Sequence, residues 1–510
     1  MEFRALAAFF TVCAGALAQS TAVCDVTAYG AKNDASARST KAIHDAIRAC
    51  AKRGGGTVYF PPGTYETGAI ELASNLILQI DAGATLRFHT DLSEYPIVPS
   101  RYEGTEGLTL APLIGGRNLG NVTITGRGTL TTDNAAWLRA TNNTEARAMW
   151  TSIQNRLENR ETIPEEDYRK AASSLRPSFI RLMDSKNILI EGIHIVGSSM
   201  WVIHLLYCEN VVVRNVMVET YPGANTDGLD IESSREVRVS DSYFDTGDDA
   251  IVLKSGRGVD GRRVGRPTEN VAITNCTFKR AHGAVVIGSE TSGGIRNVVA
   301  NNIVSKGTEI GIRIKSGRGR GGVVENLRFD TWVIDSPLKD GILVTNYYVK
   351  IPEEPVSERT PVIRNISISN VTVTAAPVVA DIQGLPEMPI ESLRIRDLTG
   401  SGKRGVQVFN TRALELRDVK IAAEQGPAFL VRDSSQLQLD RVESEENSDS
   451  VPVIRLDRIT GATVQGSRGS LSVAPGSLKS ITADPNVRAI ESSTDYWLGI
   501  DSPDREVRKQ

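Results

Sequence analysis

NILIE (187–191), NVVVRNV (210–216), EVRVSDSYF (236–244) and NVAITNCTF (270–278) are copies of one phrase in the middle of the chain. Apolar and polar residues alternate in each copy, which predicts a strand with one buried face. Related phrases run from NVTIT (121–125) to QLQLDRVES (436–444), and from residue 187 onward most copies lie about 21 to 34 residues apart. The chain is therefore built from a repeat.

A second strand follows the first in most repeats, and Gly, Asn, Asp and Ser fill the gaps between them. Examples are DDAIVLKSG (248–256), HGAVVIGSE (282–290), GIRIKSG (311–317) and DGILVTN (340–346). Repeats of this length that contain strands and no helix are typical of a solenoid whose coils stack about 4.8 Å apart. We predict an all-β fold, a single-stranded right-handed parallel β-helix, with Asn and Ser stacked at the bends.

The ends of such a coil need caps, because they expose unpaired strand edges. Residues 40–52 have the apolar spacing of a helix and are predicted to cap the N-terminal end, with the first coil starting at GGGTVYFPPGTY (54–65). The charged segment 134–177 breaks the repeat and is predicted to be a helical insertion. Residues from about 480 to 510 are predicted to form an irregular C-terminal cap.

The first eighteen residues have the pattern of a secretory signal: Arg4, an apolar run, and Ala16-Leu17-Ala18. The expectation is a secreted or periplasmic protein whose remaining chain, 19–510, is one β-helix domain. Export permits disulfides, and Cys24 and Cys50, which flank the predicted first strand and helix, can form one. Cys208 and Cys276 are expected to pack inside the coil. The net charge of -3 does not indicate a nucleic-acid partner, and no later apolar run is long enough to span a bilayer.

Four short segments carry candidate catalytic side chains: NTDG (225–228), DTGDDAI (245–251), AHG (281–283) and GIRIK (311–315). Alternation aligns Leu229 with Ile251, Ala284 and Ile312 as inward residues. In this register Asp227, Asp249 and His282 form a column at one bend on consecutive coils. Arg313 and Lys315 point outward from the next coil.

Asp248 precedes Asp249, and Gly247 permits a bend that brings both carboxylates to one side. Carboxylates packed together repel, so one of them is expected to have a raised pKa. Each segment alone has a simpler reading as a turn or a solvated face. Four of them on consecutive coils indicate acid–base chemistry on a glycosidic bond, with cations that bind a sugar carboxylate.

The set NTD, DD, HG and RIK on this repeat resembles glycoside hydrolase family 28, the polygalacturonases, from DVTAYGAKND (25–34) to about residue 350. The resemblance implies a pectin-lyase-like β-helix that hydrolyses α-1,4-galacturonosidic bonds with inversion and without a metal or other cofactor. It implies Asp248 as general acid, Asp227 and Asp249 as activators of water, and His282 as support for the acid. It also implies that Arg313, Lys315 and Tyr348 bind substrate, with Tyr347 as a rival to Tyr348.

RYEGTEG (101–107), APLIGG (111–116) and GRGTL (126–130) resemble the bacterial branch that often acts from chain ends. After GRGTL this chain has TTDNAAW (131–137), where many relatives continue into an Asp-Gly phrase, and it extends about 160 residues past the site. Internal cleavage and the exact pectic substrate (homogalacturonan, xylogalacturonan or rhamnogalacturonan-derived) therefore stay open, as do the pH optimum and the oligomeric state, for which we expect a monomer. The alternatives are a pectate-lyase-like enzyme with Ca²⁺ held by the aspartates, and a non-catalytic carbohydrate-binding β-helix.

Overall fold

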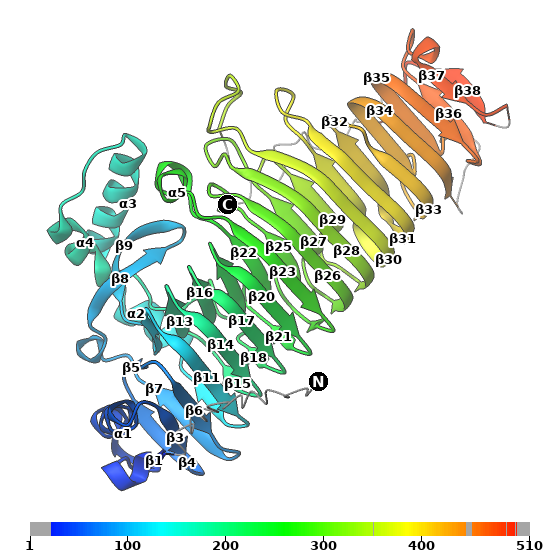
Figure 1. Ribbon diagram of the computed structural model, residues 1–510. Helices are drawn as coiled ribbons and strands as arrows, with labels where there is room; N and C mark the ends of the chain where they lie inside the picture. The colour runs from blue at the N-terminus through cyan, green and yellow to red at the C-terminus, as the bar shows by residue number, and fades with distance from the viewer. Residues whose placement is uncertain (1–21, 350, 445–450, 486, 495, 497–510) are drawn as a thin grey trace, which may run out of the picture.

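The computed structural model describes residues 22–349, 351–444, 451–485, 487–494 and 496; the predicted signal segment lies outside them. Figure 1 shows one long parallel β-helix with helices gathered along its N-terminal half. The predicted all-β solenoid is confirmed, and aliphatic side chains from Cys24 to Val487 fill its interior as one continuous core. No helix among the described residues is long and apolar enough to cross a membrane.

Three parallel stacks of strands form the coil. The first contains β1 (Val23–Asp25), β3 (Gly56–Phe60), β6 (Leu76–Ile80), β11 (Gly120–Gly126), β14 (Lys186–Glu191), β17 (Glu209–Arg214), β20 (Arg235–Ser240) and β23 (Thr268–Thr274). The second contains β2 (Asp34–Arg38), β4 (Gly63–Thr67), β7 (Ala84–Phe88), β12 (Thr129–Thr131), β15 (His194–Val196), β18 (Met217–Glu219), β21 (Tyr243–Asp245) and β24 (Thr277–Phe278).

The third stack bears the candidate site. It contains β5 (Ile70–Glu71), β10 (Ile114–Arg117), β13 (Ile180–Met183), β16 (Ile203–Leu206), β19 (Leu229–Glu232), β22 (Ile251–Lys254), β25 (Val285–Ile287), β27 (Ile310–Lys315) and β29 (Asp340–Thr345). Later strands extend the stacks, several of them bending from one stack into the next: β26 (Ile295–Lys306), β28 (Val323–Asp335), β30 (Val362–Gln383), β31 (Ile390–Phe409), β32 (Thr411–Arg412), β33 (Glu415–Ala423), β34 (Phe429–Ser444), β35 (Ile454–Gln465), β36 (Ser470–Val473), β37 (Ile481–Ala483) and β38 (Arg488–Glu491).

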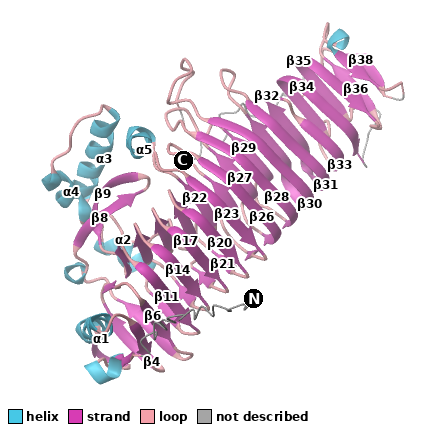
Figure 2. Ribbon diagram, viewed as in Figure 1, coloured by secondary structure: helices cyan, strands magenta, loops and turns pink. Residues whose placement is uncertain are grey.

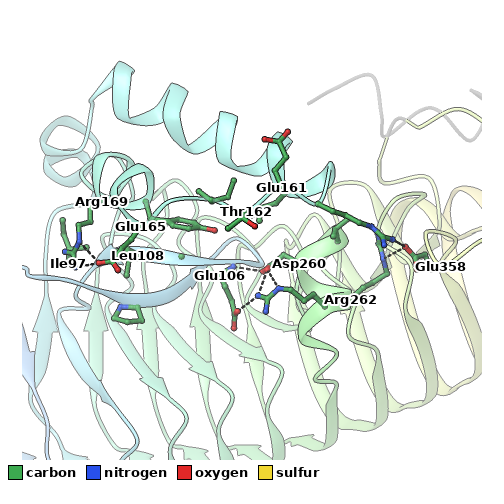
Figure 3. Close-up of a pocket in the computed structure, with 18 residues that line it drawn as sticks. Ile97, Glu106, Leu108, Glu161, Thr162, Glu165, Arg169, Asp260, Arg262 and Glu358 are labelled. Atoms are coloured by element: carbon green, nitrogen blue, oxygen red, sulfur yellow. Dashed lines mark hydrogen bonds and ion pairs between the residues drawn. The ribbon is translucent and has the colours of Figure 1, made fainter.

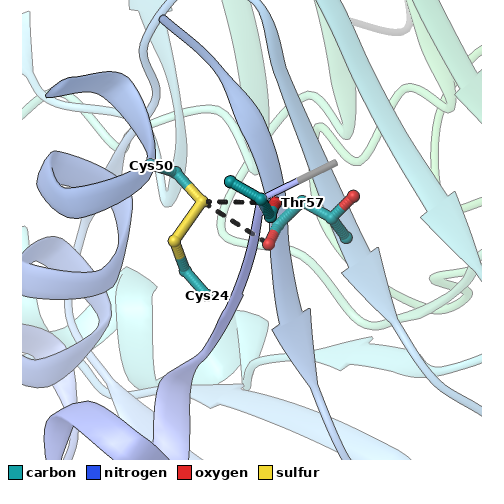
Figure 4. The surroundings of a disulfide bond; sticks show 4 residues. Cys24, Cys50 and Thr57 are labelled. Atoms are coloured by element: carbon teal, nitrogen blue, oxygen red, sulfur yellow. Dashed lines mark hydrogen bonds between the residues drawn. A yellow bond between two sulfur atoms is a disulfide. The ribbon is translucent and has the colours of Figure 1, made fainter. Parts of the chain in front are cut away.

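Helix α1 (Thr40–Lys52) caps the N-terminal end over the expected residues. It buries Ile43, Ala46, Ile47 and Cys50, which lie on one face because they are three or four positions apart. Cys50 forms a disulfide with Cys24 of β1, which ties the cap to the first coil (Figure 4). Cys208 and Cys276 are free and buried in the core.

An asparagine ladder runs along the bend before the first stack. Asn121, Asn187 and Asn210 each donate a side-chain hydrogen bond to the asparagine of the preceding coil, over 2.8 to 3.0 Å, starting at Asn75. All four have positive φ values between 55° and 61°, a conformation that asparagine tolerates better than most residues. The predicted stacking of Asn at bends is confirmed here.

Two expectations about the ends of the coil were wrong. The first coil begins at β1 and β2, ahead of α1, because β1 pairs with β3 and β2 with β4. At the other end, β37 and β38 lie within the segment expected to be irregular and continue the stacks by pairing with β35 and β36. Residues 497–510, the last part of the predicted C-terminal cap, lie outside the described residues. Strands β1, β2, β37 and β38 are only three to five residues long, which is too short to show the apolar alternation that marks the central repeats.

Two structures project from the N-terminal half, next to the third stack (Figure 2). The segment 134–177 contains α2 (Asn134–Ala140), α3 (Thr144–Glu158) and α4 (Glu165–Ala172). The antiparallel hairpin of β8 (Ile97–Tyr102) and β9 (Thr105–Leu110) was not predicted. Trp150, Ile153, Ala171 and Leu175 form a small separate core in the insertion, and Tyr102 of the hairpin packs against it. The remaining helices are α5 (Gly258–Val264) and the 3₁₀ turns η1 (Val26–Tyr29), η2 (Leu92–Glu94) and η3 (Leu478–Ser480).

Candidate active site

The predicted acids and the histidine meet at the start of the third-stack strands. Asp227 precedes β19, Asp248 and Asp249 precede β22, and His282 precedes β25. One carboxylate oxygen from each aspartate lies within 4.8 Å of the others. Backbone hydrogen bonds hold these coils together: Gly228 N donates to Asp249 O (2.9 Å), and His282 N donates to Asp248 O (3.1 Å). The structure therefore brings together the predicted column of Asp227, Asp249 and His282, with Asp248 beside it.

The register of that column differs from the prediction by one residue in its third coil. Val285, not Ala284, pairs with Ile251 and Ile312, so His282 lies level with Asp248 rather than Asp249. The run Ala284-Val-Val-Ile287 is apolar throughout, so alternation fits it equally well in either phase. Val286 shows which phase is adopted: it is buried outside the continuous core, whereas Val285 and Ile287 belong to that core together with the small Ala284.

Gly247 acts through close approach rather than through an unusual backbone conformation. A Cβ atom on Gly247 would lie 1.8 Å from the carbonyl oxygen of Gly223 in the preceding coil. Only glycine fits there. The Asp248-Asp249 pair follows this contact directly, and the amide of Asp249 donates to Asp248 Oδ1 over 2.9 Å.

Asp248 and His282 form an ion pair, with 3.0 Å between Oδ1 and Nδ1. Burial opposes ionisation of Asp248, but the hydrogen bond and charge of His282, with Lys315 and Lys254, hold the pKa of this carboxyl well below its usual range. The same hydrogen bond raises the pKa of His282 against the effect of burial. One proton is therefore held by the pair and resides on the imidazole in the free protein.

Asp227 carries the raised pKa of the cluster. Burial is the main cause, and the charge of Asp248 adds to it, while Lys254 opposes. The expectation that one of the packed acids has a raised pKa is met, but by Asp227 and not by Asp248. The pKa values of Asp227 and Asp248 shift in opposite directions because the Asp248 side chain is the more exposed and has His282 as a partner.

Cations surround the acids. Lys315 Nζ binds Asp249 Oδ2 over 2.8 Å, and Arg313 Nη1 approaches Asp249 Oδ1 at 3.4 Å. Lys315 lines the cleft, whereas Arg313 is not among the lining residues, although its guanidinium lies 5.8 Å from the centre of the Tyr348 ring. Tyr348 lines the cleft too, and its ring centre lies 4.9 Å from Lys315 Nζ. The rival Tyr347 contacts Arg318 instead, 5.7 Å from its ring centre.

Lys254 is the most prominent residue that the sequence reasoning missed. Its Nζ lies 3.4 Å from Asp227, 3.5 Å from Asp230 and Glu290, and 4.3 Å above the centre of the Trp201 ring. A signal was present, since KSGRG occurs at 254–258 and again at 315–319. Leu253 and Ile314 both pair with Ile287, so the two lysines occupy the same position on coils two apart.

The cleft has a volume of about 470 Å³ and a polar lining. Besides the residues above, it is lined by Glu103, Arg257, Glu290 and Arg320. Burial opposes ionisation of Glu290, but Lys254 and Arg320 lower its pKa to about 2. Burial, followed by the charge of Glu290, raises the pKa of Glu103. Glu103 is therefore protonated more readily than an ordinary glutamate.

The tip of the β8–β9 hairpin borders the cleft, where Glu103 belongs to the lining. Gly104 O accepts a hydrogen bond from Arg257 N (2.9 Å), and a Cβ atom on Gly104 would lie 2.8 Å from side-chain atoms of both Arg257 and Glu290. The insertion does not line the cleft; its Arg176 holds the turn before β19 by donating to Asn225 Oδ1 (2.6 Å). On this side the cleft is bordered by the hairpin, and the small core of the insertion packs against Tyr102 of the hairpin.

A larger hollow of about 980 Å³ lies between the insertion, β9 and α5 (Figure 3). The charged side chains that line it pair with one another: Arg169 with Glu165, Arg263 with Asp260, and Arg160 with Glu358. None of the acid cluster reaches it. Because the three aspartates line only the smaller cleft, the candidate active site lies there.

Comparison with known proteins agrees with this geometry. The model of the family "Glycosyl hydrolases family 28" matches residues 50–411. An exopolygalacturonase from Thermotoga maritima has a solved structure that superposes with a TM-score of 0.73 at 32% identity, covering 78% of this chain and 91% of that one. A probable polygalacturonase of Vitis vinifera is 29% identical over 73% of this chain and 72% of its own length. An exo-poly-alpha-D-galacturonosidase of Dickeya chrysanthemi is 30% identical over 64% of this chain and 57% of its own length.

Proposed function

Because this chain belongs to glycosyl hydrolases family 28, we propose that its cleft hydrolyses the α-1,4-galacturonosidic bonds of pectic galacturonan. The observation that carries this function is the cluster of Asp227, Asp248 and Asp249, in contact with His282. Carboxylates are the groups that glycoside hydrolysis uses to protonate the leaving oxygen and to activate water. Lysine and arginine side chains in the same cleft suit a polyanionic substrate.

Asp248 receives a proton from His282 and protonates the leaving oxygen. Asp248 lines the cleft and is the most accessible carboxylate of the three. The proton that the pair holds on His282 in the free protein moves to Asp248 and then to the glycosidic oxygen. This route reconciles the low pKa of Asp248 with a role as proton donor.

Asp227 and Asp249 position and deprotonate the attacking water. Inverting glycosidases usually hold their two carboxyl groups about 6.5–9.5 Å apart, to leave room for that water. The closest oxygens of the present cluster lie within 4.8 Å of one another, which is shorter than that range. Inversion thus rests on family membership, and it requires the water to sit beside Asp227 and Asp249 rather than between the closest oxygens.

Lys315 and Tyr348 bind the carboxylate of the galacturonate at the cleaved bond. Both line the cleft next to Asp249. Arg313 contributes indirectly, because it is paired with Asp249 and holds that carboxylate in place. Lys254 links Asp227 to Glu290 and provides a second positive group for the neighbouring sugar.

Cleavage occurs from the chain end. The β8–β9 hairpin tip supports this mode because it borders the cleft and is bonded to Arg257, so that we infer a barrier to the polymer on this side. The names of the Thermotoga and Dickeya relatives describe enzymes that act in this way. The carboxyl group of Glu103 lines the cleft at the hairpin tip and can form a hydrogen bond with a terminal sugar hydroxyl.

The protein acts outside the cytoplasm. The signal pattern in residues 1–18 supports export, as does the Cys24–Cys50 disulfide, since disulfides form and persist in oxidising compartments. Cell fractionation with an antibody against the protein tests this proposal. Protein confined to the reducing cytoplasm would contradict it.

The defining experiment follows the products of polygalacturonate over time, with viscosity, reducing ends and the proton NMR signal of the new anomeric centre measured together. We expect monogalacturonate from the first minutes, little loss of viscosity, and the β-anomer formed first. Oligomers with an early fall in viscosity would reject the chain-end mode, and an initial α-anomer would reject inversion. An unsaturated product absorbing in the ultraviolet, lost on addition of a chelator, would instead establish the lyase.

A further inference from the structure

A second pocket, of about 240 Å³, lies on the first coils of the third stack, beneath the β8–β9 hairpin. Its lining is mostly apolar and comes from the loops and strands around β5, β8, β10 and β13. The apolar members include Ile70, Pro96, Val98, Ala111, Pro112 and Met183. Such a lining favours a flat or branched hydrocarbon body over a sugar ring, which carries hydroxyl groups on its edges.

Arg181 of β13 brings a buried positive charge to this pocket. Its exposure is 5%, and its Nη1 donates to the Thr109 hydroxyl over 3.1 Å. Among the described residues, no carboxylate lies within ion-pair distance of Arg181. Burial alone lowers its pKa, to about 9. A buried guanidinium without a carboxylate is costly and becomes favourable when an anion binds it.

The other ionisable groups of the pocket are engaged or stand at its rim. Arg117 binds Asp184 (3.0 Å), and Glu94 binds Arg38 (2.8 Å). His44 accepts a hydrogen bond from Glu71 N, and burial, the largest influence, lowers its pKa. The Glu71 side chain is exposed to solvent. Arg181 therefore provides the charge that a ligand inside the pocket would meet.

The pocket is separate from the catalytic cleft. Arg101 of the hairpin reaches down to Glu232 (3.3 Å) and Ser233 (3.0 Å), and Glu232 binds His204 (2.9 Å), all of them buried. This network fastens the hairpin to the third stack between the two hollows. No residue lines both hollows.

We propose that this pocket binds a small aromatic monocarboxylate, with the carboxylate on Arg181 and the ring between the proline and aliphatic side chains. The guanidinium offers the two parallel N–H donors that a carboxylate prefers. The volume of about 240 Å³ suits a ligand the size of benzoate or cinnamate. The proposal is independent of the catalytic function, because it uses none of the cleft residues.

Calorimetric titration of the full-length protein with trans-cinnamate tests the proposal, with cinnamyl alcohol as the uncharged analogue and galacturonate as the sugar acid. We expect saturable binding of cinnamate and at least tenfold weaker binding of the other two. Arg181→Met should weaken cinnamate binding at least tenfold. Val98→Trp, which fills the pocket and leaves Arg181 in place, should do the same.

Two controls locate the binding. Arg117→Met removes a rim cation and should change affinity less than threefold, and Lys315→Met should leave cinnamate binding unchanged because it alters only the catalytic cleft. Equal binding of cinnamate and cinnamyl alcohol would overturn the proposal. So would cinnamate binding that survives both Arg181→Met and Val98→Trp, or that is lost in Lys315→Met.

Discussion

At the scale of single residues, Asp248 has two properties that a proton donor needs: access to the cleft and a partner that holds the proton. We expect Asp248→Asn to lower kcat by about 10²–10⁴-fold, the usual contribution of general acid catalysis, with KM little changed. Steady-state kinetics on polygalacturonate measure both. The matched control is Asp241→Asn, an acid on the same coil whose carboxylate accepts a hydrogen bond from Asn275 (3.2 Å) away from the cleft. Near-normal turnover in Asp248→Asn would remove this residue as the acid.

The pH dependence of activity should report the proton shared by Asp248 and His282. The pKa of His282 is raised, so the pair keeps its proton below and through pH 6.5 and loses it as the pH rises through the raised value. The profile of kcat/KM should therefore have an alkaline limb above pH 6.5. In His282→Ala the proton must reside on Asp248 alone, so the limb should move to lower pH.

His194→Ala is the control for this experiment, since His194 also binds a carboxylate, Glu219 at 2.7 Å, on a different stack. Its profile should match that of the wild type. An alkaline limb that stays in place in His282→Ala would show that the limb belongs to another group.

Lys315 should determine the preference for free over esterified galacturonate. A charge-assisted hydrogen bond contributes about 1.5–3 kcal/mol, and a methyl ester cannot form it. Lys315→Met is expected to reduce kcat/KM on polygalacturonate by roughly 10- to 150-fold and to reduce much less the rate on methyl-esterified pectin oligomers. Comparison of the two substrates in both proteins measures this, and an unchanged ratio would mean that Lys315 does not contact the carboxylate.

At the scale of elements, the β8–β9 hairpin decides which part of the polymer can enter. Pro99 and Leu108 are cross-strand partners, so the eight residues between them can be replaced by Asn-Gly, a good two-residue hairpin turn. This change removes the tip that reaches Arg257. The blocked end then opens, and we expect the fall in viscosity per reducing end released to become several times steeper.

Glu103→Ala is the matched control for the shortened hairpin, because it removes one side chain and leaves the backbone of the β8–β9 hairpin in place. It should weaken binding of the chain end and keep monogalacturonate as the product. If the shortened hairpin also released only monogalacturonate, the chain-end mode would have to arise from another element.

At the scale of the whole molecule, the β-helix is a stack in which each coil contacts mainly its neighbours, so a local change should stay local. The Cys24–Cys50 disulfide closes a loop of 26 residues, which corresponds to about 3.5 kcal/mol of stabilisation in the loop-entropy model. Reduction should therefore increase hydrogen exchange in β1, α1 and β3 while β19, β22 and β27 stay protected. Activity should persist under mild reduction, and simultaneous loss of protection along the entire coil would contradict this expectation.

Much of the fold and of the site could be predicted from the chain itself. The alternation of apolar and polar residues from NILIE onward specifies strands, and their spacing specifies a stacked coil, because both follow from local geometry. The same periodicity placed Asp227, Asp248, Asp249 and His282 on consecutive coils. It also placed Lys315 on the outward face of its strand. Residues that belong to a regular repeat are predictable since each copy predicts the next.

Features that do not follow from the repeat, namely the phase of one strand, the contacts of the hairpin and the protonation of the acids, were decided by the tertiary structure alone. The phase of Ala284-Val-Val-Ile287 was settled by which side chains the core accepts, because an all-apolar run alternates equally well in both phases. Arg101 and Glu232 are 131 positions apart, and only the folded hairpin brings them together as the support of the cleft wall. The distribution of protons between Asp227 and the Asp248–His282 pair depends on burial and distance, which no local pattern encodes.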